Sequence, residues 1–425
     1  MTPGHAPAPS AWQRIQTAWG LPELAGKGRF VTANLIDSLG NGLVLAFTVV
    51  FFVKTTTLSL VDVGAALTVG QLLTLPVPLV IGHLLEKLGP RAIVAVGNWI
   101  SAAGFIGFLF SQTAWQIVLW QFVVQVGATA FWMGGSPLTV AVARNVERGR
   151  WFGFVRALRN VGVGFGGAAS AVALGVSSVA GLRAVMVLNV VTFVVAGWLV
   201  ITMRGVDPSE PAQPRPVSTA ERTPSGYRTA LTDTRYLRLI ATSTVFVFAP
   251  TVIRVLLAVY AVDNLHVGSW IVGVLVVLNT AMVVLLQTLA SGWMQTRRPE
   301  TVLVLALLVN AAAFVGFGLL LVLPGWAVIA GLVIAMVLYT VAEILSSPLI
   351  SELSVVLAPA HLRGRYLGIY QVAWSVGSAV APALLTALLT AGAALPWVFL
   401  IAISVLAVPL VFGLDRRRAA APVGD

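Results

Sequence analysis

The chain has 425 residues, of which 58% are hydrophobic and only 10% are charged, and its formal net charge is +11. Soluble domains usually contain about 25% charged residues, so this composition excludes a soluble globular protein and predicts an all-α protein that crosses a membrane many times. The absence of cysteine excludes disulfides, thiolate metal sites and cysteine nucleophiles. The four histidines are scattered without metal-ligand spacing, so we expect no metal and no other cofactor.

The first apolar run, 30–53, is long enough to cross a bilayer as one helix. Residues 1–29 before it are polar and proline-rich, and we expect a cytoplasmic segment there rather than a cleaved signal. Within the run, Asn34, Asp37 and Asn41 share one helical face. A carboxylate at this depth costs roughly 2.5–3.5 kcal/mol in lipid. Asp37 should therefore face a transport pathway or the polar groups of a neighbouring helix.

The rest of the chain divides into further apolar runs on either side of a polar break. Residues 204–235 hold five prolines and many charges, a composition typical of a linker. The tail, 416–425, is basic and is expected to be cytoplasmic. The remaining sequence predicts twelve membrane helices, six in an N-terminal bundle (30–203) and six in a C-terminal bundle (236–415). The predicted helices after the first are 60–85, 91–111, 115–141, 152–175, 180–203, 236–262, 268–295, 299–322, 326–353, 365–390 and 396–414.

The basic residues of the loops are distributed very unevenly across this topology. If the N-terminus is cytoplasmic, the outer loops hold only Lys54 and Arg183, whereas the inner segments hold nearly all the other loop lysines and arginines. Inner loops of membrane proteins carry this excess of positive charge. The pattern predicts a multi-pass protein of the cytoplasmic membrane with both termini and the linker inside. It also explains the net charge without a nucleic-acid partner.

The two halves repeat one another at an offset of about 210 residues. Ser136-Pro137-Leu138 corresponds to Ser347-Pro348-Leu349, and the loop that begins Arg148-Gly149-Arg150 corresponds to Arg363-Gly364-Arg365. Both halves begin on the same side, so the repeat is parallel, about an axis along the membrane normal. Transporters use this arrangement.

The segment 82–91 resembles the signature loop of the major facilitator superfamily between the second and third helices. Gly82, Leu84, Gly89 and Arg91 match that loop, and Glu86 stands where the family usually has aspartate. The Arg-Gly-Arg loops before the fifth and eleventh helices are also similar to this superfamily. The resemblance implies the superfamily's fold of two six-helix bundles. It also implies a conformational latch, in which Glu86 caps a neighbouring helix terminus and pairs with arginines; its residues are Gly82, Glu86, Gly89 and Arg91.

The resemblance further implies that the first, fourth, seventh and tenth helices line a central cavity. Arg159, in the fifth helix, either pairs with Asp37 or extends to the inner surface. Trp132 and Tyr339 are equally compatible with ordinary core packing. The candidate residues of the substrate and ion pathway are Asn34, Asp37, Asn41, Gln121, Gln125, Trp132, Arg159, Arg254, Tyr339 and Glu343.

These observations favour a secondary active transporter that exports a small apolar or amphipathic molecule by alternating access. The chain lacks a G-x-x-x-x-G-K-[ST] motif, so an ion gradient must supply the energy, and Asp37 and Glu343 can carry protons. The alternatives are a proton-coupled importer of a sugar or organic acid, and a non-transporting receptor or assembly protein. A membrane enzyme is least favoured, because the sequence has no nucleophile–base or metal constellation. The expected partners are the substrate, the coupling ion and lipid, and we expect a monomer.

Overall fold

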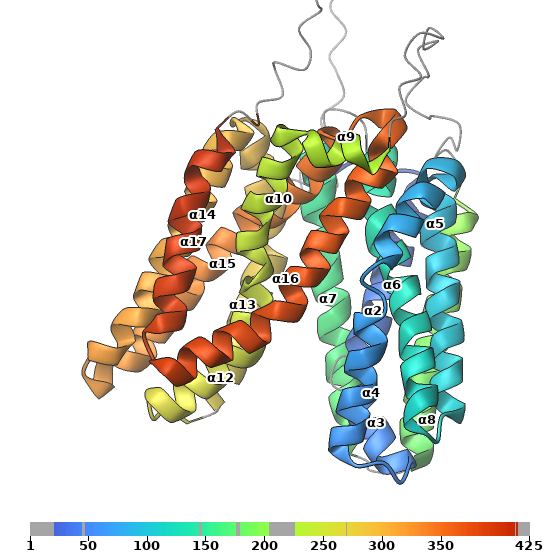
Figure 1. Cartoon of the computed structure of the whole chain (residues 1–425), viewed down its shortest axis with the longest axis horizontal. Helices are drawn as coiled ribbons and strands as arrows, with labels where there is room; N and C mark the ends of the chain where they lie inside the picture. Colours follow the sequence, from blue (N-terminus) through green and yellow to red (C-terminus); the bar gives the residue numbers. More distant parts are fainter. Residues whose placement is uncertain are drawn as a thin grey trace, which may run out of the picture.

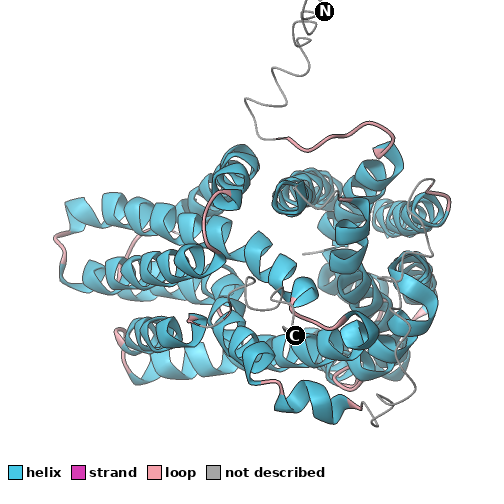
Figure 2. Ribbon diagram, turned by 90° about the horizontal axis from the view of Figure 1, so that it is seen from above, coloured by secondary structure: helices cyan, strands magenta, loops and turns pink. Residues whose placement is uncertain are grey.

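The computed structural model describes residues 21–44, 47–143, 147–175, 179–203, 226–268, 270–412 and 414, with only the backbone described at 47, 173–175, 254 and 258. Most of the expected N-terminal segment, most of the linker and the whole tail lie outside these ranges. Across the described residues the regular structure is helical, without strands (Figure 2). The prediction of an all-α protein is confirmed.

The N-terminal bundle consists of seven helical pieces, because its first membrane helix bends and its second is broken. The bend between α2 and α3 is 48°. At Gly89, φ is +75°, a conformation that favours glycine, and the chain turns there between the second and third membrane helices. The helices are α2 (Gly28–Val44), α3 (Phe47–Thr55), α4 (Leu60–Leu72), α5 (Val77–Phe110), α6 (Ala114–Val142), α7 (Arg148–Gly175) and α8 (Val179–Ile201).

The C-terminal bundle begins with a short helix, and its first membrane helix contains two π-helical segments. The short pieces are α9 (Tyr227–Thr232), α10 (Thr234–Val247), α11 (Ala249–Thr251), η3 (Val252–Leu256), α12 (Leu257–Val259) and η4 (Tyr260–Asn264). The longer helices are α13 (Trp270–Gln295), α14 (Pro299–Leu319), α15 (Gly325–Val356), α16 (Arg363–Ala391) and α17 (Leu395–Val411), with the short turns η5 (Leu320–Val322) and η6 (Ala360–Leu362) beside them.

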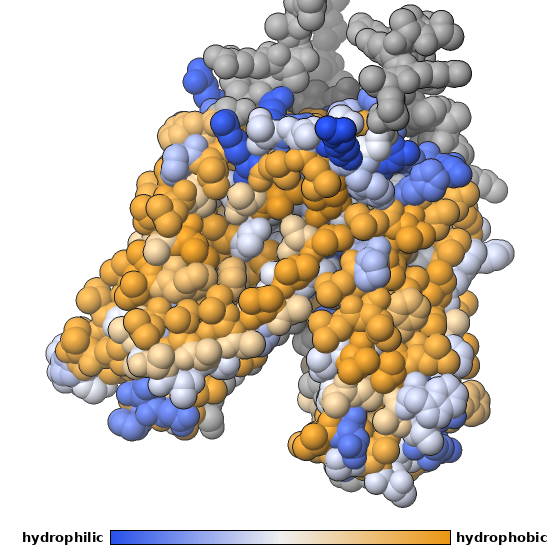
Figure 3. All heavy atoms as spheres, viewed as in Figure 1, coloured by the Kyte–Doolittle hydropathy of each residue, from blue (hydrophilic) through white to orange (hydrophobic). Residues whose placement is uncertain are grey.

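Each of the twelve predicted runs coincides with one or more of these helices. Among the described residues, seven helices are individually long and apolar enough to cross a membrane, and eight if the bent α2–α3 pair is one span. The other runs fall short for local reasons: α4 and α17 are short, α7 carries four arginines in its first half, and π-helical segments divide the seventh run. On the face shown in Figure 3, apolar residues cover the middle of both bundles, and polar residues gather at the two ends. The protein is a multi-pass membrane protein.

The two bundles meet at one end and diverge toward the other (Figures 1 and 3). We call the end that carries α9 and the first residues of α7 and α16 the closed end, and the end that carries α3 and α12 the open end. Separate hydrophobic cores fill each bundle. A further cluster crosses between them, with Ile81, Leu85 and Met133 from one bundle against Val355 and Leu367 from the other.

Candidate functional site

At the rim of the closed end, α5 touches α16 through a carboxylate and two glycines. Oε1 of Glu86 accepts a hydrogen bond from the backbone N–H of Arg365 at 3.0 Å, and Oε2 lies 3.4 Å from Nε of the same arginine. Arg365 lies in the first turn of α16, so Glu86 places a negative charge at a helix N-terminus, where it is stabilising. A Cβ on Gly82 or on Gly364 would collide with the other's carbonyl, so the two backbones are in direct contact.

The other residues of the signature loop act elsewhere. Gly89 forms the break inside α5. Arg91 donates to the carbonyl of Ile201 in α8, a contact within the N-terminal bundle. A cross-bundle bond that sequence reasoning missed comes from Tyr227 in α9, whose hydroxyl donates to the carbonyl of Leu79 in α5. Whether Gly82, Glu86, Gly89 and Arg91 work together as a latch stays a prediction.

The pseudo-symmetric contact at the closed end, between α7 and α13, brings glycines of α7 against polar side chains of α13. A Cβ on Gly153 would collide with the hydroxyl of Ser291, and one on Gly149 would lie 3.1 Å from the side chain of Gln295. Glu147, which precedes α7, lies 4.0 Å from Arg150 in the same bundle. This contact depends on close helix packing, which small residues allow.

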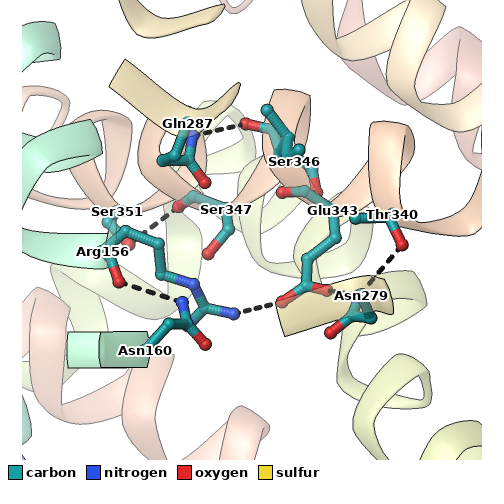
Figure 4. A network of polar contacts seen from close by, with 10 residues as sticks. Arg156, Asn160, Asn279, Gln287, Thr340, Glu343, Ser346, Ser347 and Ser351 are labelled. Carbon is teal, nitrogen blue, oxygen red and sulfur yellow. Dashed lines mark hydrogen bonds and ion pairs between the residues drawn. The ribbon is translucent and has the colours of Figure 1, made fainter. Parts of the chain in front are cut away.

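Deeper between the bundles, Arg156 of α7 forms an ion pair with Glu343 of α15 (Figure 4). The second carboxylate oxygen of Glu343 accepts a hydrogen bond from Nδ2 of Asn279 in α13 at 3.0 Å, and Asn279 also donates to the hydroxyl of Thr340 at 3.1 Å. The side chains of Arg156 and Glu343 are 34% and 18% exposed, so the pair is only partly shielded. Arg156 was absent from the candidates predicted from sequence, although its depth in an apolar helix is the signal that could have found it.

Asp37 lies inside the N-terminal bundle and is buried, with 2% exposure. Nδ2 of Asn41 donates to its Oδ2 at 3.2 Å and to its backbone carbonyl at 2.9 Å. Its other oxygen, Oδ1, has no hydrogen-bond partner among the described residues. Arg159 is near enough to interact with Asp37 electrostatically, but no ion pair joins the two in the described part of the chain. The guanidinium of Arg159 stacks instead over Phe131 at 4.7 Å and Trp132 at 4.6 Å.

A small cavity opens beside this arginine, lined by Asn34, Asn98, Phe131 and Arg159 among others. Its volume of about 10 Å³ is close to what one water molecule requires. Both amide atoms of Asn98 are buried without a partner among the described residues, so a polar group stands in an otherwise mostly apolar lining. Asn98 was not a sequence candidate, because an isolated asparagine in a helix gives no signal by itself.

The remaining sequence candidates are spread over different environments. Gln121 packs against Gly70 of α4 inside its own bundle, and Gln125 is half-buried. Trp132 is 53% exposed, whereas Tyr339 is buried in the core of the C-terminal bundle beside Phe314. The side chain of Arg254 lies outside the described residues. The polar candidates that the structure gathers near one another are Asn34, Asp37, Asn41 and Arg159, while Glu343 belongs to the contact between bundles.

The described residues contain no group of three or more histidine, aspartate or glutamate side chains that could hold a metal ion. What the site offers is a set of intramembrane charges: Asp37 and Arg159 in one bundle, and Arg156 and Glu343 between the two. Since charged side chains in membrane helices are rare and mark ion or substrate pathways, this arrangement suits the movement of a proton or a charged group through the protein.

Comparison with known families finds a match to the family model described as Major Facilitator Superfamily over residues 30–382. Among curated relatives, the chain is similar to the multidrug resistance protein MdtH of Cronobacter sakazakii, with 26% identity over 391 residues, 88% of this chain and 90% of the relative. It is also similar to MdtH of Salmonella arizonae, with 22% identity over 366 residues and 84% of each chain.

Solved structures share the fold. The transporter FucP in its outward conformation matches with a TM-score of 0.71 and 13% identity, over 93% of this chain and 98% of that one. The human organic anion transporter MFSD10 matches with a TM-score of 0.65 and 14% identity, over 90% of this chain and 98% of that one. The prediction of two six-helix bundles of this architecture is therefore confirmed.

Proposed function

The chain belongs to the major facilitator superfamily, and from this membership we propose that it exports apolar or amphipathic small molecules in exchange for protons. As a member of the family it is a membrane transporter of small molecules and not an enzyme. Direction, substrate class and coupling ion are the proposed parts.

Two features support export of poorly soluble compounds. The curated relatives are named for multidrug resistance. Among the pathway candidates, Trp132 presents an exposed aromatic ring, whereas Asn34 and Tyr339 are buried, which reduces the accessible hydrogen-bonding groups that could replace the water around a sugar. An importer of sugars or organic acids would need more such groups, because buried substrate hydroxyls must each find a partner.

We place the open end outside the cell and the closed end in the cytoplasm. The helices that begin at the closed end carry Arg148 and Arg363 as first residues, whereas the open end carries Lys54 and Arg183. This bias agrees with the positive-inside rule. In the proposed orientation the termini and the linker 204–235 lie inside, the bundles are 30–203 and 236–415, and the protein resides in the cytoplasmic membrane. One chain contains both bundles, so a monomer suffices.

The observation that carries the coupling proposal is that Oδ1 of Asp37 has no hydrogen-bond partner among the described residues. A buried, incompletely bonded carboxylate is costly as an anion, and uptake of a proton removes that cost. If the halves rock about the centre, Asp37 meets one side of the membrane and then the other, and it can carry one proton across in each cycle.

The test is transport by purified protein in liposomes, with a permanently charged lipophilic ammonium compound that the pH gradient alone cannot trap. Potassium and valinomycin hold the membrane potential at zero, and empty liposomes give the background. Exchange for protons predicts accumulation in the acidic compartment. Accumulation in the alkaline compartment would identify co-transport with protons, as in an importer, and a gradient without effect would exclude proton coupling.

A further inference from the structure

We propose that Arg156 and Glu343 form a strut between the two bundles, and that protonation of Glu343 releases it so that the closed end can open. The inference rests on the proposed exchange of substrate for protons and assigns to Glu343 a task different from that of Asp37. It starts from the ion pair in Figure 4, which joins α7 of one bundle to α15 of the other.

The pair lies in the membrane interior, deeper than the contacts at the rim of the closed end. Arg156 is eight residues from the first residue of α7, about 12 Å along the helix. On the side toward the closed end, Gly153 touches Ser291, and the contacts of Gly82 and Glu86 follow at the rim. On the other side the bundles diverge (Figure 3). Opening of the closed end must therefore separate Arg156 from Glu343.

Both carboxylate oxygens of Glu343 are bonded in this conformation. Arg156 donates to Oε1 and Asn279 donates to Oε2, so each carboxylate oxygen has a donor from a different helix. On its own helix, Thr340 accepts from Asn279, and the Ser346 hydroxyl donates to the backbone carbonyl of Glu343 at 3.4 Å. Loss of the carboxylate charge removes the charge-assisted attraction for the arginine.

The other helices packed against α15 bring no competing charge to this depth. α6 and α13 contain no charged residue at all, and Gln287 of α13 donates to the carbonyl of Ile344. The charged residues of α10, α14 and α16 lie in their first turns or close to them, at the closed end. Arg159 is one turn from Arg156 on α7 and faces Asp37. Among the described residues, Glu343 is thus the acid that pairs with Arg156.

The sign of the effect fits an exporter. The strut is intact while the open end gives access to the outside, and a proton that arrives from there neutralises Glu343. The pair then loses its Coulomb attraction, one of the contacts that keep the closed end shut. A partly exposed pair of this kind can be broken without leaving a fully buried charge, because Arg156 keeps about a third of its side chain accessible.

The experiment measures the separation of the bundles at the closed end without substrate or gradient. Spin labels at Lys87→Cys and Thr296→Cys, both exposed in this cysteine-free chain, report that separation by pulsed electron paramagnetic resonance. The parent should shift toward longer distances as pH falls. Glu343→Gln and, independently, Arg156→Gln should give the longer distances at every pH. Glu300→Gln, the same change at the start of α14 away from the contact, should respond like the parent.

Two backgrounds remove the rim acid and the proposed coupling acid from the interpretation. In Glu86→Gln the rim acid no longer titrates, and in Asp37→Asn the proposed coupling acid is removed; the pH response should persist in both. Because no transport is measured, a failure of proton-driven export would leave this result intact. The strut is refuted if the parent shows no pH response, or if Glu343→Gln retains the parent's response.

Discussion

Asp37 and Glu343 are both acids at membrane depth, but they lie in opposite kinds of surroundings. Asp37 is enclosed by one bundle, is 2% exposed and has one oxygen without a partner in the described structure. Glu343 stands between the bundles, with both oxygens bonded and 18% of its side chain exposed. Charge on Asp37 can therefore change without parting the bundles, whereas charge on Glu343 bears directly on whether they stay together.

One helix connects the two acids. Arg156 and Arg159 lie one turn apart on α7, the first paired with Glu343 and the second close to Asp37. A shift of α7 would alter both environments together. We infer that α7 couples proton binding in the N-terminal bundle to the contact with the C-terminal bundle.

Of the changes that test the contrast between the two acids, Asp37→Asn should have the largest effect on transport. Asparagine keeps the size and the hydrogen bond to Asn41 but cannot titrate, so gradient-driven accumulation should fall to the level of empty liposomes while substrate binding stays within a few-fold of the parent. Transport with an imposed pH gradient and a binding titration check this. Asp263→Asn, the same change at an exposed position of the open end, is the control. Full accumulation by Asp37→Asn would transfer the coupling role to Glu343.

A purely steric change should imitate loss of the strut. In Gly364→Ala the new methyl group meets the carbonyl of Gly82, so the closed end can no longer pack as it does here. Label distances at Lys87 and Thr296 should lengthen and lose most of their pH response, and transport should fall several-fold. Gly164→Ala on α7, where nothing lies within 4 Å, should behave like the parent. Unchanged distances in Gly364→Ala would mean that the glycine contact does not hold the closed end.

Loss of the rim carboxylate should have a smaller effect than loss of the strut. A charge at a helix N-terminus contributes about 0.3–1 kcal/mol. Glu86→Gln should therefore raise the population of molecules in which the bundles have separated at the closed end by about two- to five-fold. The same pair of labels measures this change in population. If Glu86→Gln shifted the label distances more than Glu343→Gln does, the rim contact would hold the closed end more strongly than the interior ion pair, contrary to this prediction.

The orientation of the protein in the membrane decides from which side protons reach Glu343. The cysteine substitutions that test this orientation should leave transport unchanged. Cysteines introduced at Ser59, in the turn at the open end, and at Thr229, in α9 at the closed end, are both exposed. In intact cells an impermeant thiol reagent should modify the first and not the second. Modification of Thr229→Cys from outside would invert the proposed topology and, with it, the direction of proton entry.

Much of the fold could be predicted from the sequence, because length, hydropathy and loop charge follow from the bilayer itself. The twelve runs and the two bundles have this origin. The bend between α2 and α3 and the π-helical segments near Tyr260 could not be predicted, since they depend on packing against neighbours. The burial of Tyr339 among aromatic residues of its bundle is also a tertiary result.

The sequence predicted individual residues of the candidate site but not which residues pair with one another. The cost of a carboxylate in lipid singles out Asp37 and Glu343, and the signature loop singles out Glu86. The partner of Glu343 was not apparent, because Arg156 and Glu343 are 187 residues apart and meet only through the docking of two bundles. Asn98 and Asn279 carry no pattern of their own, and only the structure shows what they face.

The division of labour between the two acids is tested most directly by downhill transport. Substrate is loaded into liposomes without a pH gradient, and its exit is followed at several pH values for the parent, Asp37→Asn and Glu343→Gln. We expect Asp37→Asn to support downhill exit that still depends on pH, through Glu343, but without proton movement, whereas Glu343→Gln should still move protons with the substrate, through Asp37; a pH-sensitive dye inside the liposomes reports the protons. If both variants fail in the same way, the two acids form a single functional unit and the division is wrong.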